Sequence, residues 1–465
     1  MAGYIFYDLE CTGLSPAFDV PVQAAFVRTC DDLVVQDELV LRARPPDHIV
    51  PSPEALLVTG LRPSDLIEAP LDQLGMMQAI AAFIEAAAPA TIIGFNSLKY
   101  DEEMLRQAFF QNLLPPYQTS LGGHRRADVL VMARAVAALD PGAIRVPEQK
   151  GKPSFRLGEL CRLNGIGLTE EDAHDALADV HATIELFRLL RERSPTLMAA
   201  LLENADKRHV QARLDAGGLL GLLAFGTIIP VTGLMTAPAN PSSMAVADLS
   251  VDPASYLDLP PAELVAAMNA RGERPIRMVK LNAQPVLLPW SLFRHAAAPC
   301  ETDAVHLERI RQISAHDDIW STLPTALEMR FADRAPSPWP EGQLYDHFIP
   351  NGDARACVTW HRLDWDRRTA FAAENFSDER LRAFANRHAF LTAPQTLCDN
   401  GRRKGQDWLL HRLTTSEDVP WLTLPRALAR CVELKVASNN DSERSHLDEI
   451  ALWLAERLKA AQTSL

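Results

Sequence analysis

The sequence of 465 residues has few cysteines and lacks the paired CxxC spacing of thiolate metal sites. Its seven cysteines are odd in number and widely scattered, which argues against a disulfide framework and favours a reducing compartment. It also lacks an excess of basic charge, because 46 Lys and Arg stand against 60 Asp and Glu, for a net charge of −14. Polyanions normally select basic surfaces, so this acidity at first argues against a nucleic-acid ligand.

Long uninterrupted hydrophobic runs are missing as well. The first ten residues, MAGYIFYDLE, contain two acids and lack the basic and apolar regions of a secretory signal. Residues 216–239 are uncharged, but glycines and prolines interrupt them, so we expect buried β-structure there rather than a membrane span. We therefore predict a cytoplasmic protein without membrane segments.

The composition is that of an ordinary globular protein, with 47% hydrophobic and 23% charged residues. A chain of this length exceeds what one hydrophobic core usually covers, so two or three domains are expected.

Residues 1–194 have the pattern of an α/β domain with a mixed sheet flanked by helices. Apolar periodicity predicts strands and helices as follows: strands at 3–9, 22–29, 33–42 and 91–95; helices at 66–88, 101–113, 127–139, 155–164 and 175–192.

Later segments have a different composition. Residues 217–290 are rich in Gly and Pro with short apolar runs, which is typical of a small β-barrel or sandwich. A Pro-rich linker at 335–342 precedes a helical region, where we expect a helix from Ser377 to Ala389 with Ser377 as its N-cap. The predicted domains are 1–194, 195–338 and 339–465.

Asp8 and Glu10 form an Asp-Leu-Glu triplet at the end of the first predicted strand. Side chains alternate along a strand, so both carboxylates point to the same face. Their repulsion is costly unless a cation neutralises it, and Mg²⁺ and Mn²⁺ prefer such oxygen ligands. A solvated strand end is the alternative explanation.

Two further motifs lie at predicted element edges. Asn96-x₄-Asp101 joins a strand to a helix, at the sheet edge where open α/β sheets place their ligands. The alternative for Asp101 is an acid that favours the first helical turn through the helix dipole. His174 and Asp179 frame a helix start, and they can face one site only if His174 lies at or before that start.

In this order, the three motifs resemble those of the DEDDh family of 3′–5′ exonucleases, which bind two metals with four acids on a ribonuclease H-like fold. The segments YIFYDLECTGLSPAFDVPVQAAFVRT, GFNSLKYDEEMLRQAFFQN, KPSFRLGELCRLNGI and AHDALADVHATIELF are similar to the bacterial exonuclease I branch of that family. IRMVKLNAQPVLLP and EGQLYDHFIPNGDA are similar to the same branch, so the resemblance covers most of the chain.

The resemblance implies roles for five residues. It assigns Asp8, Glu10, Asp101 and Asp179 to the metals and makes His174 the general base. Two Mg²⁺ ions, or Mn²⁺ in their place, would activate a water and stabilise the leaving 3′-oxygen. Neutral His174 would accept the proton of that water at cellular pH. The expected reaction is processive 3′–5′ degradation of single-stranded DNA to 5′-mononucleotides, in DNA repair and recombination.

The resemblance also implies substrate contacts. It places Glu10 and Arg156 at the terminal nucleotide, although Arg156 is also compatible with an ordinary surface arginine. Phe155 either stacks a base or, as we favour, fills the core. The family usually has Thr after the motif's Glu, whereas Cys11 here lacks the hydroxyl, so we expect no role for that side chain.

Downstream, the resemblance implies an SH3-like barrel with helical insertions and a C-terminal helical domain that close a groove around single-stranded DNA. It names the acidic C-terminal tail of a single-stranded DNA-binding protein as a candidate partner, and a monomer as the expected state. The alternatives are a 3′ exoribonuclease or proofreading-type nuclease, and a DNA-end-binding adaptor without catalysis. The adaptor is disfavoured because all five active-site positions are present.

The charge is unevenly divided along the chain. Residues 1–194 hold 17 Lys and Arg against 27 Asp and Glu, a net charge of −10, while residues 195–465 hold 29 against 33, a net charge of −4. The acidity thus concentrates where four carboxylates are expected to bind two divalent cations. A nucleic acid is therefore compatible with the net charge, provided that a local basic groove grips it.

Overall fold

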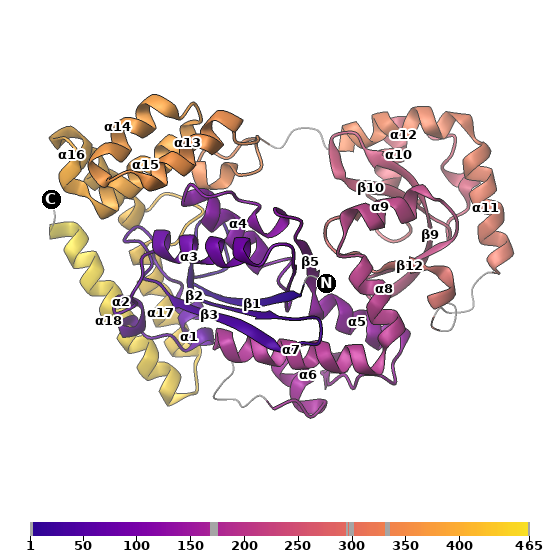
Figure 1. Cartoon of the computed structure of the whole chain (residues 1–465), viewed down its shortest axis with the longest axis horizontal. Coiled ribbons are helices and arrows are strands. Elements are labelled where there is room, and N and C mark those ends of the chain that lie inside the picture. Colours follow the sequence, from indigo (N-terminus) through magenta and orange to yellow (C-terminus); the bar gives the residue numbers. More distant parts are fainter. Residues whose placement is uncertain (1–2, 168–174, 294–295, 297–301, 331–334, 464–465) are drawn as a thin grey trace.

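In the computed structural model, residues 3–167, 175–293, 296, 302–330 and 335–463 are described. Three groups of elements lie side by side: an α/β unit in the middle, a β-rich unit on the right and C-terminal helices on the left (Figure 1).

The first sheet is mixed and has the strand order β3-β2-β1-β4-β5. Its strands are β1 (Tyr4–Cys11), β2 (Pro21–Thr29), β3 (Val35–Arg42), β4 (Thr91–Gly94) and β5 (Arg125–Asp128). Strands β1, β2 and β3 are antiparallel, whereas β4 and β5 run parallel to β1. The carboxyl ends of β1, β4 and β5 therefore meet at one edge of the sheet.

Helices cover both faces of this sheet. They are α1 (Pro53–Thr59), α2 (Pro63–Ile67), α3 (Gln73–Ala86), α4 (Asp101–Gln111), α5 (Val129–Leu139), α6 (Leu157–Leu163) and α7 (Ala176–Arg193), with the short strands β6 (Glu148–Gln149) and β7 (Lys152–Pro153) before α6. Helices α3 and α4 share a core with Ile5 and Tyr7 of β1, while α5, α6 and α7 share one with Phe6. Alternate residues of β1 thus serve the two cores, as the strand pattern predicted.

Two predicted elements differ from the structure. The helix expected over 66–88 is divided into α2 and α3, because Pro70 cannot continue a helix and Asp72 caps a new one by accepting from the Gly75 N–H. The helix expected from 127 begins only at Val129, and the preceding residues form β5, a strand of four residues that is too short to give a clear periodic pattern.

The second sheet is antiparallel, with the strand order β11-β10-β9-β8-β12. Its strands are β8 (Leu220–Ala224), β9 (Thr227–Ala237), β10 (Asn240–Asp248), β11 (Ile276–Lys280) and β12 (Leu287–Pro289). The accompanying helices are α8 (Pro195–Glu203), α9 (Lys207–Asp215), α10 (Pro261–Met268), α11 (Asp303–Ala315) and α12 (Asp317–Arg330). Residues 216–239 contribute β8 and β9, which confirms the β-structure expected there.

The last group is helical and packs on the α/β unit (Figure 1). Its helices are α13 (Asn351–Arg362), α14 (Trp365–Asn375), α15 (Glu379–Thr392), α16 (Asp399–Thr414), α17 (Leu424–Ala437) and α18 (Asp441–Thr463). The expected N-cap at Ser377 was wrong, because Asp378 caps α15 and the Ser377 hydroxyl donates to Asp353 instead. Within the described ranges, no helix is both long and apolar enough to cross a membrane.

Candidate active site

Asp8 and Glu10 lie on β1, the central strand of the first sheet. Pairing of β1 with β4 ends at Phe6, so both acids lie beyond it, at the carboxyl edge. Phe6 packs against Phe187 of α7, whereas Tyr7 belongs to the core on the opposite face. Because side chains alternate, Asp8 and Glu10 share the α7 face with Phe6.

Asp179 comes to these acids from the first turn of α7. The N-cap of this helix is Asp175, whose carboxylate accepts from the N–H groups of Leu177 and Ala178. Its other oxygen, Oδ2, accepts from Gln23 Nε2 at 2.9 Å, and Gln23 lies opposite Glu10 in the β1–β2 register. The start of α7 is therefore attached to the sheet beside the Asp8–Glu10 pair.

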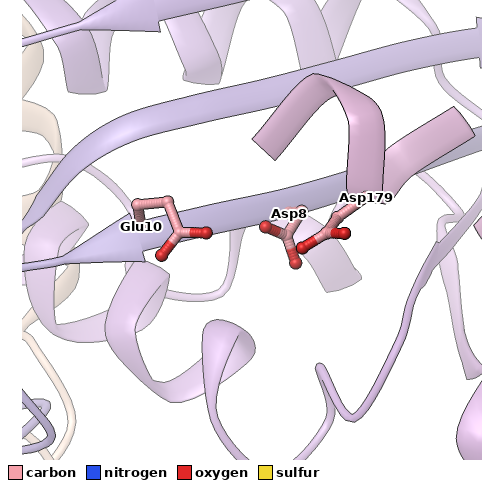
Figure 2. A group of neighbouring side chains, drawn as sticks. All are labelled: Asp8, Glu10 and Asp179. Carbon is pink, nitrogen blue, oxygen red and sulfur yellow. The ribbon is translucent and has the colours of Figure 1, made fainter. Parts of the chain in front are cut away.

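The side chains of Asp8, Glu10 and Asp179 converge (Figure 2). One carboxylate oxygen from each lies within 4.8 Å of the others. Glu10 is buried, and the other two acids are half-buried. Such a group of hard oxygen donors fits a divalent cation.

Asp101 lies at the N-terminus of α4 and is buried, with 5% of its surface exposed. Among the described residues it does not join the tight group of three. Its charge nevertheless acts on that group, because Asp101 is the charged neighbour that most raises the pKa of Asp8. A hydrogen bond also joins the start of α4 to the residues that follow β1. The hydroxyl of Tyr100, directly before Asp101, donates to the carbonyl of Gly13, just beyond the Asp-Leu-Glu triplet, at 2.6 Å.

The electrostatics of this site favour a cation. Burial and then the negative charges of Asp179 and Asp101 raise the pKa of Glu10 to about 8. Burial also raises the pKa of Asp101 to about 8, and it raises that of Asp8 well above the usual range. The charged groups that shift Asp8 and Glu10 are themselves acids. A divalent cation would supply the missing positive charge, so the residues fit a metal.

Comparison with known proteins supports a nuclease. The exonuclease family matches residues 5–187, and the exonuclease I C-terminal domain matches residues 339–457. Exodeoxyribonuclease I of Haemophilus influenzae is 31% identical over 403 residues, which cover 81% of this chain and 84% of that protein. The chain belongs to the exonuclease I family. Together with the carboxylate group, this membership makes it a metal-dependent exonuclease and argues against the binding-only adaptor.

Other family members agree over most of their length. Exodeoxyribonuclease I of Escherichia coli is 28% identical over 436 residues, covering 88% of this chain and 89% of that protein. The solved exonuclease I of Methylocaldum szegediense has 27% identity and a TM-score of 0.86, covering 98% of this chain and 100% of that one. The E. coli enzyme in complex with a dA16 oligonucleotide has the same coverage, 24% identity and a TM-score of 0.85, and shows the shared fold.

His174 and Arg156 are the two predicted site residues outside the carboxylate group. His174 lies outside the described residues, and the first residue of α7 is Ala176. Arg156 is the N-cap residue of α6, with 73% of its side chain exposed and a guanidinium nitrogen 3.6 Å from Glu159. Phe155 is half-buried and packs against the core beside Arg134, which agrees with the expected packing role.

Three residues that support the site, Glu102, Asp128 and Gln23, were not predicted from the sequence. Glu102 is not merely a first-turn acid, because it is 1% exposed and pairs with Arg106 and Arg126. Asp128 was also overlooked, although an acid directly before the apolar run 129–139 is a recognisable helix cap. Gln23 gives no local signal, since its partner Asp175 lies 152 residues away in the chain.

Proposed function

We propose that this enzyme degrades single-stranded DNA from its 3′ end to 5′-mononucleotides, processively and in DNA repair and recombination. The observation that carries the proposal is the convergence of Asp8, Glu10 and Asp179 at one edge of the sheet. Family membership supports a DNA substrate, because each of the curated relatives is an exodeoxyribonuclease. That the E. coli protein has been solved with a DNA oligonucleotide supports a single-stranded substrate.

The metal ligands of the proposal are Asp8, Glu10, Asp101 and Asp179. They would hold two Mg²⁺ ions, or Mn²⁺ in their place. When bound, such ions lower the pKa of water and stabilise the charge on attacking and leaving oxygens. The fold fixes where these four carboxylates lie, because two are on β1 and the others are in the first turns of α4 and α7.

His174 is the proposed general base, which accepts the proton of the attacking water. Asp175 follows it directly in sequence, and its bond from Gln23 holds the chain beside the carboxylates. This attachment supports the assignment, because a general base must lie within hydrogen-bond reach of the water that it deprotonates.

Substrate contacts belong to the same proposal. Glu10 and Arg156 would bind the terminal nucleotide, and the Arg156 side chain is 73% exposed, so a phosphate could compete with Glu159 for its guanidinium. The proposed divisions of the chain are residues 1–194, 195–338 and 339–465, with the second unit an SH3-like barrel. A monomer, a cytoplasmic location and docking of the tail of a single-stranded DNA-binding protein complete the proposal.

The test is a parallel assay on 3′-labelled oligonucleotides of single-stranded DNA, duplex DNA and RNA, with Mg²⁺ and with EDTA. We expect single-stranded DNA to be shortened from its 3′ end, the duplex to stay largely intact, and EDTA to stop the reaction. Equal degradation of RNA and DNA would overturn the DNA assignment and favour the exoribonuclease alternative.

A further inference from the structure

The loop between β11 and β12 reaches from the β-rich unit to the free edge of the first sheet. Gln284 in this loop is 1% exposed and adopts a left-handed backbone conformation, with φ of +46°. Such conformations are unfavourable in a residue other than glycine, and they persist where the surroundings hold them. The hydrogen bonds of this loop therefore show what holds it in this conformation.

One connection passes through Asp128, the last residue of the edge strand β5. Its backbone N–H donates to Gln284 Oε1 at 2.7 Å. The Asp128 carboxylate accepts from the N–H groups of Asn96 at 2.9 Å and Leu98 at 3.2 Å. Asn96 is itself left-handed, with φ of +60°. Asp128 thus holds the strained segment that leads into α4 and to Asp101.

A second connection passes through Arg126, two residues earlier on β5. Its Nη2 donates to the carbonyl of Asn282 in the same loop at 3.2 Å. Its Nη1 donates to Glu102 Oε1 at 2.7 Å, and Glu102 follows Asp101 directly. Thr119 also donates to that oxygen, at 2.6 Å, so Glu102 is fixed in place.

The two connections reach Asp101 from both sides: one fixes the backbone before it, the other the residue after it. We propose that the loop at residues 282–284 positions Asp101 for metal binding, with Gln284 and Arg126 as positioning residues. The β-rich unit then completes the geometry of the metal site as well as covering the edge of the sheet. This inference rests on the proposed metal-dependent function, in which Asp101 is a ligand.

The direct test replaces Gln284 with methionine, which preserves length and volume but removes the amide. Mn²⁺ binding to the full chain is measured without DNA, by the electron paramagnetic resonance of the free ion. Loss of a residue that orients a metal ligand typically costs about 10–100-fold in metal affinity or activity. We expect Gln284→Met to weaken Mn²⁺ binding and lower kcat within this range, while KM for a single-stranded oligonucleotide changes less than twofold.

The matched control is Asn204→Leu. Asn204 is 1% exposed and donates to the carbonyls of Pro285 and Leu287, next to the loop, but it makes neither of the two connections to Asp101. Its loss should lower stability and leave Mn²⁺ affinity unchanged. If both variants weaken Mn²⁺ binding equally, general loosening of the unit explains the result and the positioning role is refuted.

A second variant covers the case in which Gln284→Met does not fold. Arg126→Lys keeps a positive charge beside Glu102 but lacks the fork that also reaches Asn282, and it should weaken Mn²⁺ binding in the same direction. Wild-type Mn²⁺ affinity in a folded Gln284→Met or, failing that, Arg126→Lys variant would overturn the inference. A wild-type chain that neither binds Mn²⁺ nor degrades DNA would instead overturn the proposed function.

Discussion

Two buried carboxylate sites in this molecule have opposite electrostatics. In the active site, burial raises the pKa of Glu10 and of Asp101 to about 8, and neighbouring acids add to the shift at Glu10. Glu341, in the short helical turn Pro340–Gln343 beside α15 and α16, is also buried, yet Arg387 and Arg412 hold its pKa below the usual value. Arg387 Nη2 lies 2.6 Å and Arg412 Nη1 lies 3.5 Å from Glu341 Oε1.

The difference teaches how to distinguish a structural acid from a functional one. Glu341 is neutralised by its own chain, so its charge is satisfied whenever the protein is folded. The charged neighbours that shift the pKa values of Asp8 and Glu10 are other acids, and this repulsion is a cost that a bound cation removes. Four experiments test this contrast, in decreasing order of expected effect.

The largest effect is expected from Asp179→Asn. A metal site supplies several kcal/mol of transition-state stabilisation, and about 4 kcal/mol corresponds to about a thousandfold in rate. We expect kcat on single-stranded DNA to fall by about this factor while the strand still binds, as measured by fluorescence anisotropy. The control is Glu185→Gln, an exposed acid on the same helix. Wild-type turnover in Asp179→Asn would show that Asp179 is not a ligand.

Glu341→Gln should destabilise the fold without changing the chemistry. Breaking a buried ion pair leaves uncompensated charge and costs about 3–5 kcal/mol. The measurement is urea unfolding together with kcat per folded molecule, which should stay near that of the wild type. Glu379→Gln is the matched control, because Glu379 is 93% exposed in its pair with Arg382 and such a surface pair contributes little. Equal stability in both variants would contradict the structural role.

Asp8→Asn should have the opposite effect on stability. Without metal, Asp8 must on folding either keep its charge beside other acids or take up a proton, and Asn avoids both costs. In EDTA we therefore expect a gain of about 1 kcal/mol in the free energy of unfolding and a higher Tm, at the expense of activity. In saturating Mn²⁺ we expect the wild type to be more stable than Asp8→Asn, because only the wild type is stabilised by a tightly bound ion. Thermal unfolding under both conditions checks this. A variant less stable than the wild type in EDTA would refute the repulsion.

The smallest expected effect is the contribution of His388 to the pH dependence of the free energy of unfolding. Burial lowers the pKa of His388 to about 4, with contributions from Arg387 and His361, although a bond to the Gln111 carbonyl and the charge of Asp72 oppose this shift. An unfolded histidine titrates near 6.5, so the unfolded chain binds the extra proton between these values. Stability from neutral His388 is present above pH 6.5 and is lost as the pH falls toward 4.

His388→Gln should therefore lose less stability than the wild type between pH 7 and pH 5, as measured by urea unfolding at both values. The control is His181→Gln, an exposed histidine on α7. An identical pH dependence in the wild type and His388→Gln would exclude His388 as the source of acid sensitivity.

Much of the fold and site was predictable from local pattern. The spacing of Asp8 and Glu10 predicted a shared face because strand geometry has a period of two. Apolar periodicity predicted a helix over 175–192, and α7 begins one residue later, at Ala176. The residues at which helices begin were less predictable. Ser377 and Asp378 are both good capping residues, and the choice between them depended on Asp353, which is 24 residues away and takes the Ser377 hydroxyl.

What the sequence by itself determined is the type and order of the acids, and the faces and helix starts on which they lie, because these depend on residues within one or two turns. Only the tertiary structure decided how the acids are held. Gln23 reaches Asp175 across 152 positions, and Gln284 reaches Asp128 across 156. Such contacts give no pattern in the local sequence, because they form only when elements that are distant in the chain pack together. The polar groups buried by this packing are then mostly paired with one another.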